Sequence, residues 1–376
     1  MSNAQKSTLL PTQLGPAEVR QVVDTVTSEE WTPDTPAIML WGAPGIGKSS
    51  VVAQSAASRG FGFIDVRLTQ VQVIDILGLP YLEDAATGDP HAREKITRFA
   101  KSVLLPDGSA DRWIIMLDEL ASALPAIQTQ AYQLITEHRV GPHTLPPHTH
   151  VVAASNRLTD RAVVYRMPSA LISRTVHIEV RADLEQWLDY SWPRGLRPDI
   201  AAYLRTNPSR LLDESMISDT TPFPCPRTWT YANRILTLFE RQGTDPESKV
   251  VRTLLEGTIG PGIAADWYTY RRLFGRIPDC RAIIEGRDSP TPPSEPDVLY
   301  ATTCSLVALL REYQDLTHAL KWIQKLPRNY AVLALRDAFR QGREVRDRLQ
   351  ASPAWQSTAE QFATAIFMAM GGKNGQ

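Results

Sequence analysis

The residues best suited to chemistry lie in one segment, 42–49, which fits the pattern G-x-x-x-x-G-K-[ST] in full. Its glycines let the backbone curl so that N–H groups face a phosphate, and a helix beginning after the loop adds its positive end. Lys48 would bridge the β- and γ-phosphates, and Ser49 would hold Mg²⁺. The pattern therefore predicts an ATP site with bound magnesium. The predicted nucleotide-binding residues are Gly42, Ala43, Pro44, Gly45, Ile46, Gly47, Lys48, Ser49, Ser50 and Asp118.

A second segment, 113–119, is an apolar run that ends in two carboxylates, Asp118 and Glu119. Taken alone, such a run is more often an ordinary strand end. Parallel strands, however, bring their carboxyl ends to one edge of a sheet, beside the phosphate-binding loop. Asp118 would then share the Mg²⁺ with Ser49, and Glu119 would polarise the attacking water, which a hydrolase needs and a simple nucleotide binder does not.

A third apolar run, 151–154, is followed by Ser155 and Asn156. The amide of Asn156 would lie near the γ-phosphate and orient the water. The alternative is that Asn156 only caps the turn before Leu158.

Five short apolar runs alternate with helical patterns between residues 17 and 180, which is typical of a parallel sheet with both faces buried. The runs are 38–41, 63–66, 113–117, 151–154 and 176–178. Residues 74–110 form an insertion with many turn residues and little strand character, and such insertions are usually functional or mobile. Residues 139–150 carry Gly-Pro and Pro-Pro pairs, which indicate a β-hairpin with edges blunted by proline.

Strand patterns fade after residue 180, and helical spacing takes over in 184–204, 228–241, 248–255 and from 298 onward. A proline-rich stretch, 289–296, reads as a stiff linker. We therefore expect a nucleotide-binding domain over 1–182, a helical domain over 183–288 and a helical C-terminal region over 289–376.

The composition, with 43% hydrophobic and 22% charged residues among 376, is that of a soluble globular protein of two or three domains. Forty basic and 41 acidic residues offer no overall attraction to nucleic acid or anionic membranes, although a local basic patch is compatible with that balance. The three cysteines form no disulfide or metal pattern, and no secretion signal or membrane span is visible. We expect a cytoplasmic protein without membrane contact.

Three histidines of the predicted hairpin, His143, His148 and His150, raise the question of a metal site. No cysteine or carboxylate within the hairpin completes a ligand set. Surface exposure or packing within the hairpin is therefore the favoured interpretation.

Taken in order along the chain, these motifs resemble the MoxR branch of the AAA+ ATPases, in the helix-2-insert group. Many NTPases share the phosphate-binding segment, but the ordered combination over about residues 15–240 is more selective. The resemblance rests on segments 42–49, 75–80, 117–120, 131–134, 139–141, 154–157, 167–174 and 223–229.

The resemblance implies an α/β fold: a P-loop AAA+ parallel five-stranded sheet of order 5-1-4-3-2 with helices on both faces, then an all-α lid and a helical C-terminal region. It also implies hexameric rings with ATP bound between subunits. Arg174 matches the arginine finger that reaches the neighbouring subunit, with Arg157, Arg161 and Arg166 as nearby rivals or co-workers. Arg227 matches the sensor 2 arginine of the lid, acting in cis or in trans. The expected catalytic residues are Glu119, Asn156, Arg174 and Arg227.

For function, the resemblance implies a chaperone-like ATPase that remodels a partner protein or complex, together with a protein containing a von Willebrand A-type domain. The insertion and the hairpin would touch this client. The alternatives are a nucleic-acid motor, a GTP-driven restriction component, and a client-binding module formed by the chain beyond Pro296. The near-zero net charge disfavours the nucleic-acid motor, and nothing in the motifs favours guanine.

Overall fold

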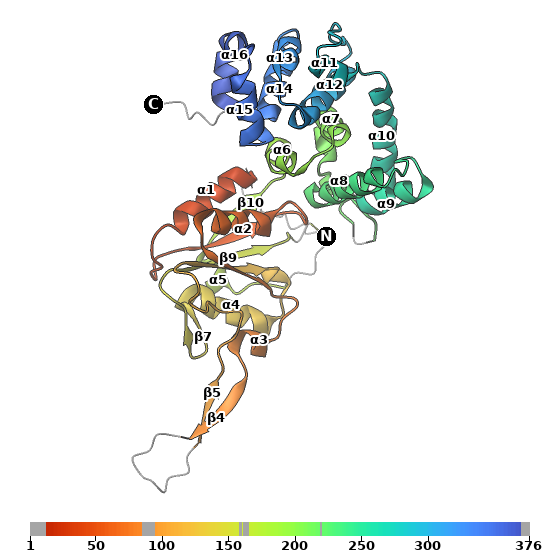
Figure 1. The fold of residues 1–376 in the computed structure, drawn as a ribbon. Helices are drawn as coiled ribbons and strands as arrows, with labels where there is room; N and C mark the ends of the chain where they lie inside the picture. The colour runs from red at the N-terminus through yellow and green to blue at the C-terminus, as the bar shows by residue number, and fades with distance from the viewer. Residues whose placement is uncertain (1–12, 85–94, 158–159, 161–164, 219, 370–376) are drawn as a thin grey trace, which may run out of the picture. The chain divides into compact units, whose positions relative to one another are not determined.

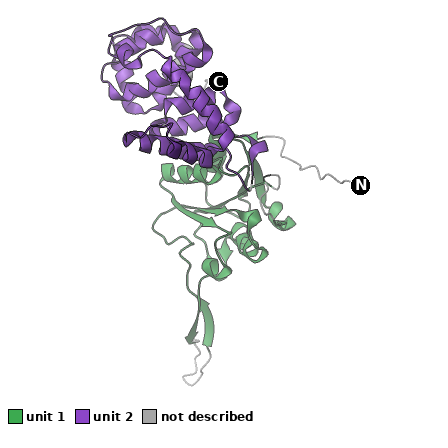
Figure 2. Ribbon diagram, turned by 90° about the vertical axis from the view of Figure 1, so that its right-hand side faces the viewer, with its two compact units in different colours: residues 1–182 green, residues 183–376 purple. Residues whose placement is uncertain are grey.

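The chain forms two compact units, residues 1–182 and 183–376, which are described separately (Figure 2). The computed structural model describes residues 13–84, 95–157, 160, 165–218 and 220–369. The boundary between these units lies between Ala182 and Asp183. A further division at residue 289 stays a prediction.

The first unit is built on a six-stranded parallel sheet in the order β1-β10-β2-β9-β6-β3 (Figure 1). Numbered along the chain, the five predicted strands lie in the order 5-1-4-3-2, so the predicted fold class is confirmed. The sixth strand, β1, has two residues, pairs with the edge of β10 and was not predicted. The strands are β1 (Gln13–Leu14), β2 (Ala37–Trp41), β3 (Gly62–Arg67), β6 (Trp113–Asp118), β9 (Thr149–Ser155) and β10 (Thr175–Val180).

Helices cover both faces of this sheet (Figure 1). On one face lie α1 (Pro16–Val26) and α2 (Lys48–Arg59), and on the other α4 (Pro125–Glu137) with the short α5 (Ser169–Ile172). Alternate residues of the central strands, such as Met39 and Leu117, pack against α4. This double covering explains why the central strands β2, β6 and β9 are mostly apolar.

The insertion differs from the prediction, because it contains two strands where the sequence shows little strand character. After α3 (Val73–Leu77), β4 (Pro80–Asp84) and β5 (Lys95–Phe99) pair as an antiparallel ribbon away from the main sheet (Figure 1). The ribbon has no core face, so its sequence lacks the alternation that marks a half-buried strand. Leu79 and Leu82 are each 66% exposed on it.

The predicted hairpin over 139–150 is confirmed as β7 (Arg139–Val140) and β8 (His143–Thr144), although its last two residues belong to β9. His138 precedes it in the left-handed backbone conformation, with φ 53°. This residue ends α4 and turns the chain into the hairpin.

The described part of the second unit is helical. The pattern over 184–204 is interrupted by a 3₁₀ turn at Pro193, where the missing N–H of proline favours a break. The proline-rich stretch is fixed to this unit, since Trp322 Nε1 donates to the Pro290 carbonyl at 2.9 Å. The helices are α6 (Leu184–Ser191), α7 (Pro198–Thr206), α8 (Pro226–Arg241), α9 (Lys249–Ile259), α10 (Pro261–Arg271), α11 (Cys280–Ile284), α12 (Pro296–Leu309), α13 (Thr317–Ile323), α14 (Arg328–Arg340), α15 (Arg343–Ala351) and α16 (Trp355–Ala369).

Within the described ranges, no helix is both long and apolar enough to cross a bilayer.

Candidate nucleotide site

The predicted phosphate-binding loop connects the end of β2 directly to the start of α2. Gly45 and Gly47 have φ values of 78° and 100°, a region that other residues rarely adopt. At Gly42, a side chain would place its Cβ only 2.7 Å from the Val180 carbonyl oxygen. The glycines of the motif therefore serve the loop conformation and its close packing against β10.

Lys48 is the first residue of α2, and its side chain turns back over the loop. Its Nζ donates to the carbonyls of Gly42 at 2.8 Å and Ala43 at 3.1 Å, and to Asn156 Oδ1 at 3.0 Å. An ammonium group only donates, so the oxygen of the Asn156 amide faces it. The Asn156 nitrogen is thereby oriented as a donor beside the loop. The structure thus brings together two residues that lie 108 positions apart.

Ser49 and Asp118 meet at the carboxyl edge of the sheet, where Ser49 Oγ donates to Asp118 Oδ2 at 2.7 Å. A hydroxyl and a single carboxylate are hard oxygen ligands, which suit Mg²⁺ that is also held by phosphate oxygens and waters. The described residues contain no cluster of three or more histidine, cysteine or acidic side chains able to hold a metal alone. These residues therefore fit a magnesium ion that arrives with a nucleotide.

Glu119 follows β6 in the left-handed conformation, with φ 61°. Its Oε2 accepts a hydrogen bond from Thr69 Oγ1, in the turn after β3. The backbone N–H of Glu119 donates to Asp118 Oδ1 at 2.9 Å. These contacts give the two carboxylates different surroundings: Asp118 faces Ser49, whereas Glu119 turns towards Thr69.

Asp65 is a further carboxyl group near this edge, on β3 beside β6. Partial burial raises the pKa of Asp65, and the like charge of Asp118 raises it further. Asp65 and Asp118, on neighbouring strands, are therefore close enough to affect each other's ionisation.

Arg174 lies between α5 and β10 and is exposed. Its Nη1 donates to the Ala170 carbonyl at 3.2 Å, and its guanidinium carbon lies 5.8 Å from the centre of the Tyr132 ring. Arg166 is also exposed, and Arg161 lies outside the described residues. An exposed arginine on a surface turn has the placement that action on a neighbouring molecule needs.

Arg157 is a correction to the predicted group of rival fingers. Its side chain is buried, and it donates to Glu179 Oε1 at 2.7 Å and Asp160 Oδ1 at 2.8 Å. Glu179 also accepts from Gln13 Nε2 at 2.9 Å. This network holds Arg157 inside its own unit, so it is not placed to reach another subunit.

Arg227 is exposed at the start of α8 in the second unit. Its predicted role as sensor 2 requires an approach to a nucleotide held by the first unit. That role stays a prediction.

Two of the predicted hairpin histidines, His148 and His150, have partners within the first unit. His150 Nε2 donates to the Glu29 carbonyl at 2.9 Å, and His148 Nε2 lies 3.2 Å from a Glu30 oxygen. His138 Nε2 donates to the Thr149 carbonyl at 2.8 Å, and its ring stacks on Trp31. Burial lowers the pKa of both His138 and His150. Main-chain carbonyls thus pair with His138 and His150, and a carboxylate pairs with His148.

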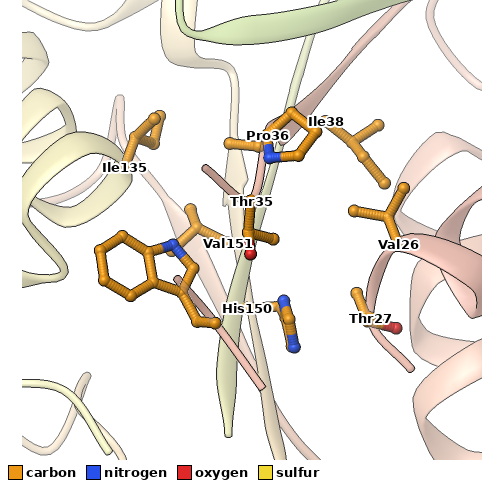
Figure 3. A pocket seen from close by; sticks show the side chains of 10 residues that line it. Val26, Thr27, Thr35, Pro36, Ile38, Ile135, His150 and Val151 are labelled. Carbon is orange, nitrogen blue, oxygen red and sulfur yellow. The ribbon is translucent and has the colours of Figure 1, made fainter. Parts of the chain in front are cut away.

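A shallow pocket lies beside His150, at the amino ends of β2 and β9 (Figure 3). It has an empty volume of about 260 Å³, part of it open to solvent. Its lining is mostly apolar and lies at the opposite edge of the sheet from Lys48 and Asp118. We therefore assign the chemistry to the carboxyl edge. The lining residues are Val26, Thr27, Trp31, Thr35, Pro36, Ala37, Ile38, Ile135, His150 and Val151.

No protein-family model matches the chain, and no curated protein matches it. Among solved structures, NtrX from Brucella abortus in complex with ADP is similar at 14% identity, with a TM-score of 0.40 over 95% of this chain and 69% of that one. A single-residue mutant of RuvB from Thermotoga maritima is similar at 13% identity, with a TM-score of 0.37 over 83% of this chain and 94% of that one. These values are too low to transfer a function, which must come from the site itself.

Some residues of the site were not predicted from the sequence. Thr69 belongs to no motif. The one sign in the sequence is that Thr69 follows an apolar run, as Glu119 follows a different apolar run. The pairing of Arg157 with Glu179 had no visible sign, since the two residues lie 22 positions apart, one after β9 and the other on β10. Such pairs become visible only when the strand order is known.

Proposed function

We propose that this chain is an Mg²⁺-dependent ATPase of the AAA+ class, of the MoxR type. The observation that carries the proposal is the contact between Ser49 and Asp118 at 2.7 Å, with Glu119 as the next residue. A metal-binding pair beside a phosphate loop accounts for nucleotide binding, and the adjacent Glu119 supplies a base for hydrolysis.

The residues of the site divide the work of hydrolysis. Lys48 exchanges its contacts with the loop carbonyls for phosphate oxygens of ATP. Ser49 and Asp118 would hold the Mg²⁺, which offsets charge on the phosphates. Glu119 accepts a proton from the attacking water, and the Asn156 amide orients that water. We place this reaction in the cytoplasm, where thiols such as the three buried free cysteines stay reduced.

We further propose that the chain works as a ring, a hexamer by resemblance, in which Arg174 completes the site of the neighbouring subunit. The support is the exposure of Arg174 on a surface turn, with a weak contact to the Ala170 carbonyl at 3.2 Å. A guanidinium supplied in trans stabilises the charge of the transition state and makes hydrolysis depend on assembly.

The client is, by resemblance, a partner protein or complex, acted on together with a von Willebrand A-type protein. The support is the ribbon of β4 and β5, where Leu79 and Leu82 are each 66% exposed and Tyr81 is 50% exposed. A two-stranded ribbon is marginally stable alone, so covering these side chains with a partner surface would stabilise it.

A mixing experiment tests this function. The wild-type chain is expected to release phosphate from ATP in the presence of Mg²⁺, and Lys48→Ala should bind no nucleotide. Arg174→Ala should bind ATP through its intact loop but turn it over slowly. Mixed together, these two inactive variants should recover turnover, because some interfaces then pair an intact pocket with an intact arginine.

Two outcomes would contradict the proposal. A wild-type chain that is fully active as a monomer in light scattering would exclude the ring. Wild-type turnover by Arg174→Ala would show that another arginine acts as the finger, with Arg161 and Arg166 as the next variants to measure.

A further inference from the structure

A side-chain bridge connects the strand that leads into the phosphate loop with the turn that carries Arg174. Trp41, the last residue of β2, donates from Nε1 to His177 Nδ1 at 2.8 Å. His177 Nε2 lies 3.1 Å from the Ile172 carbonyl oxygen, two residues before Arg174. The bridge therefore runs from the residue before Gly42 to the end of α5.

The chemistry of the three groups fixes the direction of each hydrogen bond. The indole of Trp41 can only donate, so Nδ1 of His177 must accept and carries no proton. A neutral imidazole then has its proton on Nε2, which donates to the Ile172 carbonyl. His177 is thus held as one tautomer by partners on two different elements.

The turn before Arg174 depends on such outside support. α5 has only four residues, and a single helical turn is not stable by itself. Thr175 Oγ1 lies 3.1 Å from the Leu171 carbonyl and 3.0 Å from His177 Nε2. Two side chains of β10 therefore hold the last carbonyls of α5, and with them the direction in which Arg174 leaves the turn.

The other end of the bridge adjoins the phosphate loop. Gly42 follows Trp41 and packs so closely against β10 that an added Cβ would lie 2.7 Å from the Val180 carbonyl oxygen. The ring centroids of Trp41 and His177 lie 6.0 Å apart with 12° between the ring planes, the arrangement of two rings joined edge to edge by this hydrogen bond. The bridge is therefore anchored on the residue that leads into the phosphate loop.

We propose that Trp41 and His177 are positioning residues that aim Arg174 at the neighbouring subunit, through a bridge anchored beside the subunit's own phosphate loop. This inference rests on the proposed function, in which Arg174 acts in trans. It adds that the subunit donating the arginine must keep the bridge intact, even when its own pocket does no chemistry.

The test uses two kinds of chain mixed in equal amounts. The recipient is Arg174→Ala, whose pocket is intact. The donors all carry Lys48→Ala, so that every turnover occurs in the recipient's pocket. One donor has no other change, and the others add Trp41→Phe, His177→Phe or His177→Gln.

The unmodified donor, which carries Lys48→Ala and no other change, should restore turnover. The Trp41→Phe and His177→Phe donors should restore it about 10-fold to 100-fold less well, the scale of displacing a catalytic group by about 1 Å. The KM for ATP should stay that of the recipient, because the pocket is unchanged. His177→Gln should recover part of the loss, since its amide can still accept and donate.

The outcomes separate the two proposals. If the bridge-broken donors match the unmodified donor at equal assembly by light scattering, the bridge has no positioning role and this inference is wrong. If no donor restores turnover, action of Arg174 in trans fails, and both proposals fall together. If the Trp41→Phe and His177→Phe donors lose rescue only because they do not assemble, the residues are structural, and the positioning role is again contradicted.

Discussion

The two edges of the central sheet both bury polar side chains, but they pair them in different ways. At the carboxyl edge, Lys48 contacts Asn156, and Ser49 contacts Asp118. At the amino edge, His138 and His150 donate to main-chain carbonyls. In the proposed function, phosphate, metal or water would replace the side-chain partners at the carboxyl edge, together with the loop carbonyls of Gly42 and Ala43 that Lys48 also contacts. The carbonyls at the amino edge pair with buried histidines, so that edge holds the structure together.

The same difference appears in the backbone. Both edges contain a left-handed residue that is not glycine, Glu119 at φ 61° and His138 at φ 53°. Such a conformation costs free energy and persists only where the surroundings hold it. At His138 a buried carbonyl contact and the stacked Trp31 hold it, whereas the Glu119 side chain is held by the hydroxyl of Thr69 in an exposed turn.

The largest expected effect comes from the carboxyl edge. Glu119→Gln should still bind ATP but turn it over at least about 10²-fold more slowly, because the amide cannot take the proton from water. The matched change at the other edge, His150→Gln, should keep wild-type turnover at neutral pH. Phosphate release and binding of a fluorescent ATP analogue measure both. Equal losses in the two variants would erase the distinction between the edges.

An intermediate effect is expected at Arg157. Its position just after β9 places it at the carboxyl edge, but its buried contacts with Asp160 and Glu179 make it a structural residue. Arg157→Met leaves Glu179 and Asp160 buried without their cation. Removing one partner of a buried ion pair typically costs about 3–5 kcal/mol of folding free energy. Urea unfolding should show this loss, while the exposed control Arg166→Met should change the free energy by less than about 0.5 kcal/mol.

If Arg157→Met were as stable as wild type and yet inactive, Arg157 would act in catalysis. The correction made from its burial would then be wrong.

The smallest effect is a pH dependence at the amino edge. Burial holds the pKa of His150 below its usual 6.5, so the unfolded chain takes up this proton first as the pH falls. The neutral form therefore contributes stability that is fully present above about pH 6.5 and is lost progressively below it. His150→Gln should show a shallower fall in melting temperature between about pH 7 and pH 5. A slope identical to that of wild type would mean that His150 does not titrate in this window.

The two insert-like segments show where sequence patterns stop being informative. The hairpin over 139–150 was predicted, because Gly141-Pro142 marks a turn by local chemistry alone. The ribbon of β4 and β5 was not, because its strands pair only with each other and present no buried face. Alternation of apolar and polar residues arises where one face of a strand is buried, and an exposed ribbon has no such face.

By itself, the sequence determined the parts of this protein whose chemistry is contiguous. The phosphate loop from Gly42 to Ser49, the carboxylates at the end of β6 and the apolar central strands β2, β6 and β9 are each written into short segments, because local backbone geometry or burial on both faces dictates the residue types. Only the tertiary structure decided the contacts between distant side chains that no motif marks.

Because β10 packs between β1 and β2, Glu179 on β10 pairs with Arg157. This pairing excludes Arg157 as a candidate arginine finger. The same packing placed His177 between Trp41 and the turn before Arg174. A side chain carries no sign of its partner when that partner lies on another strand, since the contact depends on strand order and register.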